Sequence, residues 1–268
     1  MSMSELKEKV SKGIPLTDEL VIDSHCHMGL WQNFNLFKGD AAGMVSRMDR
    51  MGVNACIAAH HASIGPDYIY GNSEVLKAMS DFPGRIYGYA TVNPNYPEQE
   101  IIAEMDRCIA AGMIGIKLHP SLHDCPVDGN KYAPVWEYAN EHSLPLLSHT
   151  EVGGPNPVCA FEKLAELYPN VTILLGHSGF GSKGADAAIE TVSKYPNIYA
   201  ELAGSTLVYG TLERMVRSIG ADRIIFGTDL PFMDSRPQLG RVAFAKITGE
   251  EKRLILGGNA KRIFGIGA

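Results

Sequence analysis

Eight apolar segments of strand length recur along this chain at intervals of roughly 30 residues, the length of one strand plus one helix. The segments run over Leu20–Asp23, Ala55–Ala59, Ile86–Val92, Ile114–Leu118, Leu144–Leu147, Val171–Leu175, Ile198–Leu202 and Ile224–Phe226. Between them, stretches such as residues 97–105 and 161–167 repeat their apolar positions every three or four residues, as amphipathic helices do. This alternation of strands and helices predicts an α/β fold with a parallel sheet.

Polar residues at the ends of these segments favour a closed barrel over an open, doubly wound sheet. Five segments lead into a histidine, a lysine or an aspartate, in Val21–His27, Gly115–His119, Leu146–His149, Leu174–His177 and Ile225–Asp229. The outer strands of an open sheet lie far apart, so these side chains can converge only if the sheet closes. We therefore expect a single (β/α)8 TIM-barrel domain over residues 1–268, with residues 1–20 as a helical lead-in.

Composition excludes several classes of function. The net charge is −6 and the basic residues are scattered, so the sequence has no electrostatic footprint for nucleic acid or an anionic membrane. No apolar run approaches the roughly 20 residues that span a bilayer, and the polar, charged start is unlike a signal peptide. The five cysteines lack a Cys-x-x-Cys pair and are expected to be reduced. We expect a cytoplasmic protein that acts on a small molecule, and the sequence leaves homo-oligomerisation open.

The first strand carries the leading candidates for a metal site. Side chains two residues apart on a strand share a face, so His25 and His27 can bind one cation from a single strand. The alternative is a pair of core histidines bonded to backbone carbonyls. Asp23 lies one layer deeper on the same face, where it would orient an imidazole N–H or form a buried salt bridge.

Residues ending later strands complete this candidate site. His149 closes the fifth strand and His177 the sixth, so that with the first strand they supply three or four nitrogen ligands suited to zinc or a similar divalent ion. Asp229 ends the eighth strand. A carboxylate there can bind the metal and take a proton from bound water, or it can simply cap a helix.

The ordered set of motifs resembles a known enzyme family. The set comprises Asp-x-His-x-His at 23–27, Gly-x-Lys-x-His-Pro at 115–120, the single histidines ending strands five and six, Phe-Gly-Thr-Asp-x-Pro at 226–231 and the closing segment 256–265. Together they resemble the amidohydrolase superfamily, and within it the amidohydrolase-related (amidohydrolase 2) branch of TIM-barrel metal-dependent hydrolases. That branch also contains non-oxidative decarboxylases related to aminocarboxymuconate-semialdehyde decarboxylase. The resemblance covers essentially the whole chain.

The resemblance implies roles for individual residues. His25, His27 and Asp229 would bind the metal, His149 would be a further ligand, and His177 would orient or polarise the attacking water or the substrate. The metal is expected to be a single zinc ion, with manganese or another divalent ion as the alternative.

Three residues near these ligands each have two alternative roles. In binuclear members of the superfamily a lysine at the position of Lys117 is carboxylated and bridges two metals; because the branch resembled here usually has one metal, we expect an ammonium that binds a substrate carboxylate. His119 shares the inward face of Lys117 and would contact substrate or make an ordinary hydrogen bond. Glu201 would contact substrate or anchor a ligand histidine.

Two further groups lie near the predicted mouth of the barrel. His60 and His61 are adjacent and point to opposite faces, so at most one can face the site. The three aromatic residues Trp31, Phe34 and Phe37, in the loop after the first strand, would form a lid or pack on the rim.

These assignments predict a reaction as well as a site. The main expectation is hydrolysis of a small amide, lactone or ester by a metal-activated water, with Asp229 taking the proton and His177 assisting. The alternative is non-oxidative decarboxylation of an aromatic or unsaturated carboxylic acid on the same ligands. A second alternative is a barrel that binds a small acid without turnover. Both the hydrolase and the decarboxylase would act on a small molecule, and the metal ligands alone do not distinguish the two reactions.

Overall fold

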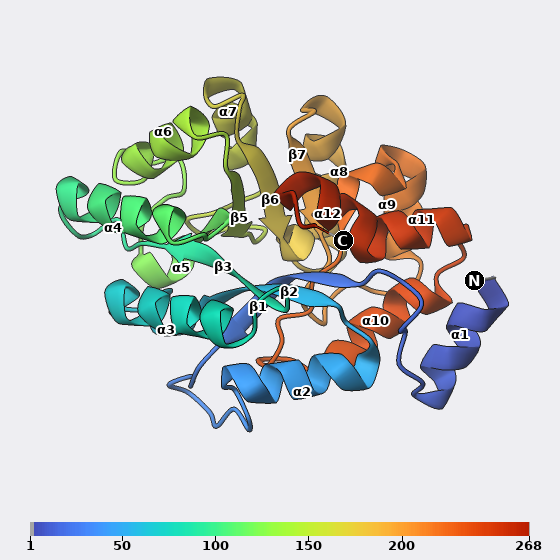
Figure 1. Ribbon diagram of the computed structural model, residues 1–268. Coiled ribbons are helices and arrows are strands. Elements are labelled where there is room, and N and C mark those ends of the chain that lie inside the picture. Colours follow the sequence, from blue (N-terminus) through green and yellow to red (C-terminus); the bar gives the residue numbers. More distant parts are fainter. Residues whose placement is uncertain (1–2, 268) are drawn as a thin grey trace.

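The eight parallel strands pair with one another in the order in which they occur in the chain. The computed structural model describes residues 3–267, and the predicted barrel is confirmed, with helices surrounding the strands (Figure 1). The strands are β1 (Ile22–Met28), β2 (Ala55–His60), β3 (Ile86–Thr91), β4 (Gly115–Leu118), β5 (Pro145–His149), β6 (Thr172–Gly176), β7 (Ile198–Glu201) and β8 (Ile224–Ile225). Each overlaps one of the eight predicted segments.

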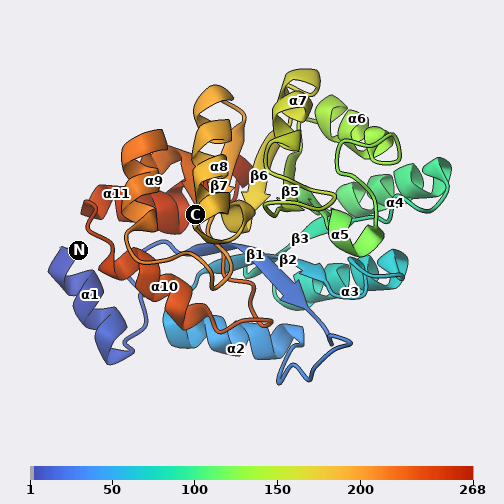
Figure 2. The same ribbon diagram turned by 180° about the vertical axis from the view of Figure 1, so that it is seen from behind.

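Helices follow the strands as the sequence periodicity predicts. The α-helices are α1 (Met3–Lys12), α2 (Ala41–Met51), α3 (Tyr68–Asp81), α4 (Glu98–Ala110), α5 (Pro120–His123), α6 (Ala133–Glu141), α7 (Ala160–Leu167), α8 (Gly181–Lys194), α9 (Thr211–Ile219), α10 (Ser235–Phe244), α11 (Gly249–Arg253) and α12 (Asn259–Phe264). Two segments, η1 (His177–Gly179) and η2 (Ala221–Arg223), are 3₁₀ helices, and η3 (Leu254–Gly258) is a π-helix. Helix α1 lies in the predicted lead-in and beside α10, while α10 lies next to α2 (Figures 1 and 2). No helix within residues 3–267 is long and apolar enough to cross a membrane.

Backbone hydrogen bonds between β1 and the chain after β8 close the barrel. The amide of Ser24 donates to the carbonyl of Phe226 at 3.0 Å, and the amide of Asp229 donates to the carbonyl of His25 at 2.8 Å. The amide of His27 donates to the carbonyl of Leu230 at 2.7 Å. Because these bonds hold Asp229 beside β1, closure itself places a carboxylate next to the two histidines of that strand.

The side chains inside the barrel are apolar at its middle and polar at its mouth, where the carboxyl ends of the strands lie. Leu147 and Tyr199 belong to the buried cluster inside the barrel. Since side chains alternate along a strand, the residues two positions further on, His149 and Glu201, point to the same interior from the carboxyl ends of β5 and β7. The strand period therefore places the polar side chains together at the end of the barrel where catalytic groups of this fold lie.

Candidate active site

His25, His27 and Asp229 form a compact group at the mouth of the barrel. The Nε2 atoms of His25 and His27 lie 3.1 Å apart, and Oδ1 of Asp229 lies 3.3 Å and 3.6 Å from them. The pairing register of β1 against β2 shifts between Asp23 and Cys26, so the strand that carries the histidines is irregular at this point. All three side chains are buried, and burial holds the pKa of both imidazoles well below their usual range. The neutral rings keep lone pairs available for a metal.

The atoms of this group fit a divalent cation. The ligand atoms of the three residues lie within 4.8 Å of one another. Two nitrogens 3.1 Å apart can occupy neighbouring positions on one ion that lies about 2.1 Å from each. Nδ1 of His27 and Nδ1 of His177 are buried and have no hydrogen-bond partner among the described residues. His25, His27 and Asp229 therefore make a site for a divalent metal ion.

Glu201 fixes the orientation of His25 from behind. Its Oε2 lies 2.9 Å from Nδ1 of His25 and also accepts the backbone N–H of His177 at 2.9 Å, while Oε1 accepts that of Ala203 at 2.6 Å. Burial raises the pKa of Glu201 to about 7, although the two backbone donors favour its charged form. A carboxylate on Nδ1 leaves the Nε2 lone pair of His25 pointing toward His27 and Asp229, the arrangement found behind metal-binding histidines.

Glu201→Gln should weaken metal binding by about 10 to 100-fold, the usual cost of losing a carboxylate behind a metal-binding histidine. Glutamine keeps the shape but loses the charge that favours the Nδ1–H tautomer of His25. The measurement is competition between the protein and a chelator of known affinity. The matched control is Glu137→Gln, an exposed position on α6, which should bind metal as the parent does. Equal affinity of both variants would show that Glu201 does not position a ligand.

Three of the four predicted metal ligands converge, and the fourth lies beside them. His149 belongs to neither metal-binding group within the part of the chain that the structure describes; the second such group is His25, His177 and Glu201. The ring of His149 stacks on His119 at 4.2 Å between centroids and lies 4.7 Å from the ring of His177. His177 in turn places Nδ1 3.5 Å from Oδ2 of Asp229. The site is a row of imidazoles with Asp229 at one end.

Lys117 contributes a buried cation to the same place. Its Nζ lies 2.8 Å from Nε2 of His25, and the side chain is fully buried. Burial lowers the pKa of Lys117 to about 8, while the carboxylates of Asp229 and Glu201 act in the opposite direction. His119, two residues further along, is partly buried and stacks on His149.

Aromatic side chains cover the group. His61 stacks against His27 at 5.3 Å between centroids, and Trp31 lies 5.1 Å from His61. The ring of Phe232 packs against those of Trp31 and Phe34, with 5.8 Å and 5.0 Å between the ring centroids. Trp31 and His61 line a cavity of about 350 Å³. Polar side chains, among them Gln32 and Asn93, line it as well.

Of the other residues expected near the site, His61 lies in it, whereas His60, Phe37 and Asp23 make contacts elsewhere. Of the two adjacent histidines, His61 faces the site, while Nδ1 of His60 accepts the backbone N–H of Ala62 at 3.0 Å. Phe37 is 72% exposed and lies apart from the other aromatic residues. Asp23 orients no imidazole and forms no ion pair within residues 3–267. Its carboxylate instead accepts the amide and the hydroxyl of Thr228 at 3.0 Å and 2.5 Å, because barrel closure brings the turn before Asp229 within its reach.

Two aromatic residues of the site were not predicted from the sequence. Phe180 stacks on His177 at 4.3 Å between centroids, and Phe232 belongs to the aromatic cover. Each follows a polar strand-end residue by three positions, Phe180 after His177 and Phe232 after Asp229. That spacing was visible in the sequence and could have identified both.

The sequence as a whole fits one family model. The model described as amidohydrolase matches residues 22–266, which include all eight strands and every residue of the group described above. The chain belongs to the amidohydrolase family. The resemblance drawn from the motifs is thereby confirmed.

Relatives with stated activities include several decarboxylases. A gamma-resorcylate decarboxylase of Polaromonas sp. strain JS666 is 25% identical over 244 residues, covering 72% of this chain and 74% of that protein. A 5-carboxyvanillate decarboxylase from Sphingomonas paucimobilis has a similar structure, with a TM-score of 0.74 and 16% identity over 92% of this chain and 99% of the other. A 5-carboxyvanillate decarboxylase from Novosphingobium aromaticivorans, solved with manganese and 4-hydroxy-3-methoxy-5-nitrobenzoic acid, has a TM-score of 0.72 and 14% identity, over 93% and 97%.

The comparisons correct the expected reaction. Hydrolysis of an amide, lactone or ester was the main expectation, and it is wrong: the relatives with stated reactions are decarboxylases. The physical reason for the error is that one set of strand-end ligands can serve both reactions, while the loops over the mouth determine which substrate enters. Zinc is likewise unsupported, since the Novosphingobium structure contains manganese.

Proposed function

We propose that this protein is a metal-dependent, non-oxidative decarboxylase of a small aromatic carboxylic acid. The observation that carries the proposal is a chain of aromatic contacts that begins at the metal-binding group, from His27 through His61 and Trp31 to Phe232. His25, His27 and Asp229 offer a divalent metal site with Lys117 beside it, and Trp31 and Phe232 lie at the cover. A flat aromatic substrate would pack against these side chains while its carboxylate meets the positive charge of the metal ion and Lys117. The activity of the Polaromonas relative supports the same reaction.

The proposed ion is manganese, held by His25, His27 and Asp229. Nitrogen and carboxylate donors suit this ion as well as zinc, and the Novosphingobium relative was solved with it. When bound, the ion would supply the positive charge that holds and polarises the acidic substrate. We assign Glu201 to positioning His25, the second of the two roles open to it, because it is fully buried behind that ring.

Asp229 and His177 are the proposed proton-transfer pair. Oδ1 of Asp229 faces the two histidines of β1, while Oδ2 lies 3.5 Å from Nδ1 of His177, which has no hydrogen-bond partner within residues 3–267. In the metal-free site, burial raises the pKa of Asp229 to about 8, and a cation bound at Oδ1 would lower it again. The proton is therefore proposed to move through Oδ2, the oxygen that faces His177. The proton would pass to the ring carbon that bears the carboxylate. The bond to the carboxylate then breaks, its electron pair stays with the ring and carbon dioxide leaves.

Lys117 is proposed to act as an unmodified ammonium. It lies 2.8 Å from His25 on the floor of the site, where its charge favours an anionic substrate. His119 and His149 extend the row of imidazoles and are assigned to substrate contact, with His149 also available as a further ligand.

Incubation of the manganese-loaded protein with aromatic acids tests this function. The panel holds 2,6-dihydroxybenzoate, 5-carboxyvanillate and unsubstituted benzoate, with lactones and amides assayed in parallel for acid release. We expect carbon dioxide in equal amount to the acid consumed, loss of the activity on chelation and its recovery with manganese. Acid release from a lactone or amide, without carbon dioxide from any acid, would refute the decarboxylase.

A further inference from the structure

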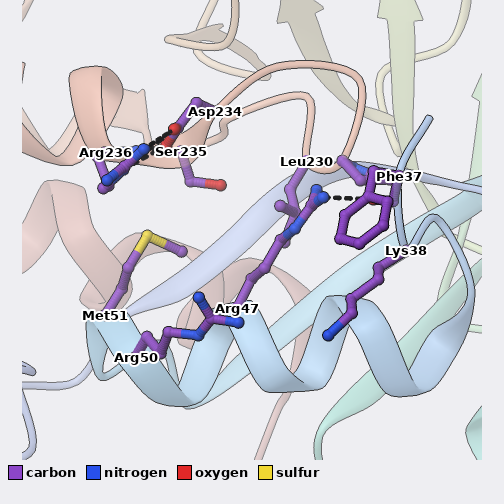
Figure 3. A pocket seen from close by; sticks show the side chains of 10 residues that line it. Phe37, Lys38, Arg47, Arg50, Met51, Leu230, Asp234, Ser235 and Arg236 are labelled. Carbon is purple, nitrogen blue, oxygen red and sulfur yellow. Dashed lines mark hydrogen bonds and ion pairs between the residues drawn. The ribbon is translucent and has the colours of Figure 1, made fainter. Parts of the chain in front are cut away.

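A second cavity, of about 450 Å³, lies outside the mouth of the barrel. It is bounded by the end of the β1–α2 loop, by the exposed side of α2 and by the segment that joins Asp229 to α10 (Figure 3). It shares no lining residue with the metal-binding group among the residues described. Nothing proposed above for decarboxylation uses it.

The cavity is strongly cationic in a protein that is acidic overall. Its charged side chains are those of Lys38, Arg47, Arg50 and Arg236, against the single carboxylate of Asp234. Four positive charges therefore face one negative charge here, although the chain as a whole has a net charge of −6. Such a local excess repels itself and attracts small anions from solution.

Three of these four cations have no ion pair among the residues that the structure describes. Asp234 pairs with Arg236, and Arg47 donates to the backbone carbonyl of Phe37. The side chains of Lys38 and Arg50 form neither a hydrogen bond nor an ion pair with any residue in the range 3–267, and Figure 3 draws no dashed line to either. The ammonium of Lys38 lies 5.7 Å from the centroid of the Phe37 ring. Lys38 also has a backbone φ of 52°, an uncommon conformation for lysine.

A buried hydroxyl in the cavity wall is also without a partner. Ser235, the first residue of α10, is 2% exposed, and its Oγ has no hydrogen-bond partner within residues 3–267. A buried polar group is costly unless something bonds to it. Phe37, Met51 and Leu230 supply an apolar part of the same wall.

We propose that this cavity binds a small organic phosphate. Guanidinium groups match phosphate oxygens in geometry, and a phosphate dianion balances the charge excess better than a single carboxylate does. The hydroxyl of Ser235 can donate to a phosphate oxygen, and the apolar wall would take the organic group. The volume falls within the range of small-ligand pockets, so a compound the size of a nucleoside monophosphate fits and a macromolecule is not needed.

Calorimetry with adenosine 5′-monophosphate on the metal-loaded protein tests the proposal. The double variant Lys38→Ala with Arg50→Ala should bind at least about tenfold more weakly, since one charge-assisted hydrogen bond alone contributes about that factor to affinity. Both side chains are exposed, so the fold should survive, and circular dichroism and Tm verify this. The matched control is Arg217→Ala: Arg217 and Arg50 are each exposed in the last turn of an outer helix. It should bind as the parent does, and binding to the parent should weaken as salt rises.

Three outcomes would overturn the proposal. Equal affinities of the double variant and Arg217→Ala would show that the cavity is not the site. Loss of binding in Asp229→Asn, but not in the double variant, would place the ligand in the candidate active site. Binding of adenosine or of inorganic phosphate as tight as that of the nucleotide would remove the requirement for an organic phosphate. Decarboxylase activity of the double variant should stay unchanged, which separates this test from that of the proposed function.

Discussion

Replacing His25 and His27 together by alanine should remove metal binding and, with it, decarboxylation. Loss of a group behind a ligand usually costs about 10 to 100-fold in affinity, so loss of two direct ligands should cost at least about 10³-fold. The two Nε2 atoms are 3.1 Å apart, and no other pair of residues replaces their geometry in the described groups, both of which include His25. Elemental analysis of the purified variant measures the metal content.

The control for this variant is His142→Ala. His142 is an exposed histidine at the end of α6, so its removal should change neither metal content nor activity. If the double variant keeps the metal content of the parent, the ion is bound elsewhere and the assignment of β1 as the metal-binding strand is wrong.

Asp229→Asn should lower kcat by at least about 100-fold, the lower end of what general acid–base catalysis contributes. Asparagine keeps the shape of the side chain but cannot deliver a proton and is a weaker ligand. The geometry adds to the effect, because the carboxylate faces the β1 histidines through one oxygen and His177 through the other. Rates should be measured on the best acid of the panel, with metal content determined in the same sample.

Asp222→Asn, an exposed aspartate just before β8, serves as the matched control and should retain full activity. Near-normal turnover of Asp229→Asn with metal still bound would contradict the role of Asp229. His177 would then be the remaining proton donor, to be tested by His177→Gln.

Local sequence patterns were sufficient to predict the barrel and the centre of the site. Apolar runs at intervals of roughly 30 residues predict alternating strands and helices, and polar residues at five strand ends favour a closed sheet. Because the strand period is two, His25 and His27 must share a face. Closure between the first and last strands then brings Asp229 to them.

Contacts between strands far apart in sequence could be decided only by the tertiary structure. Periodicity gives the face of a side chain but not its partner, so the pairing of Glu201 with His25 and of Asp23 with Thr228 depends on how the ends of β7 and β8 meet β1. For the same reason, periodicity could not predict that the ring of His149 stacks on His119 and lies outside the group of His25, His27 and Asp229.

Loops separated in sequence also create features that no local pattern contains. The aromatic cover joins Trp31 to Phe232, and the cationic cavity joins residues 37–51 to residues 230–236. The sequence by itself determined the barrel, the inward face of each strand and the convergence of His25, His27 and Asp229, because these follow from short-range periodicity and chain closure. The tertiary structure alone decided that His149 lies outside this group, which side chains cover it and where the unpaired cations gather, because these depend on packing between segments that are distant in sequence.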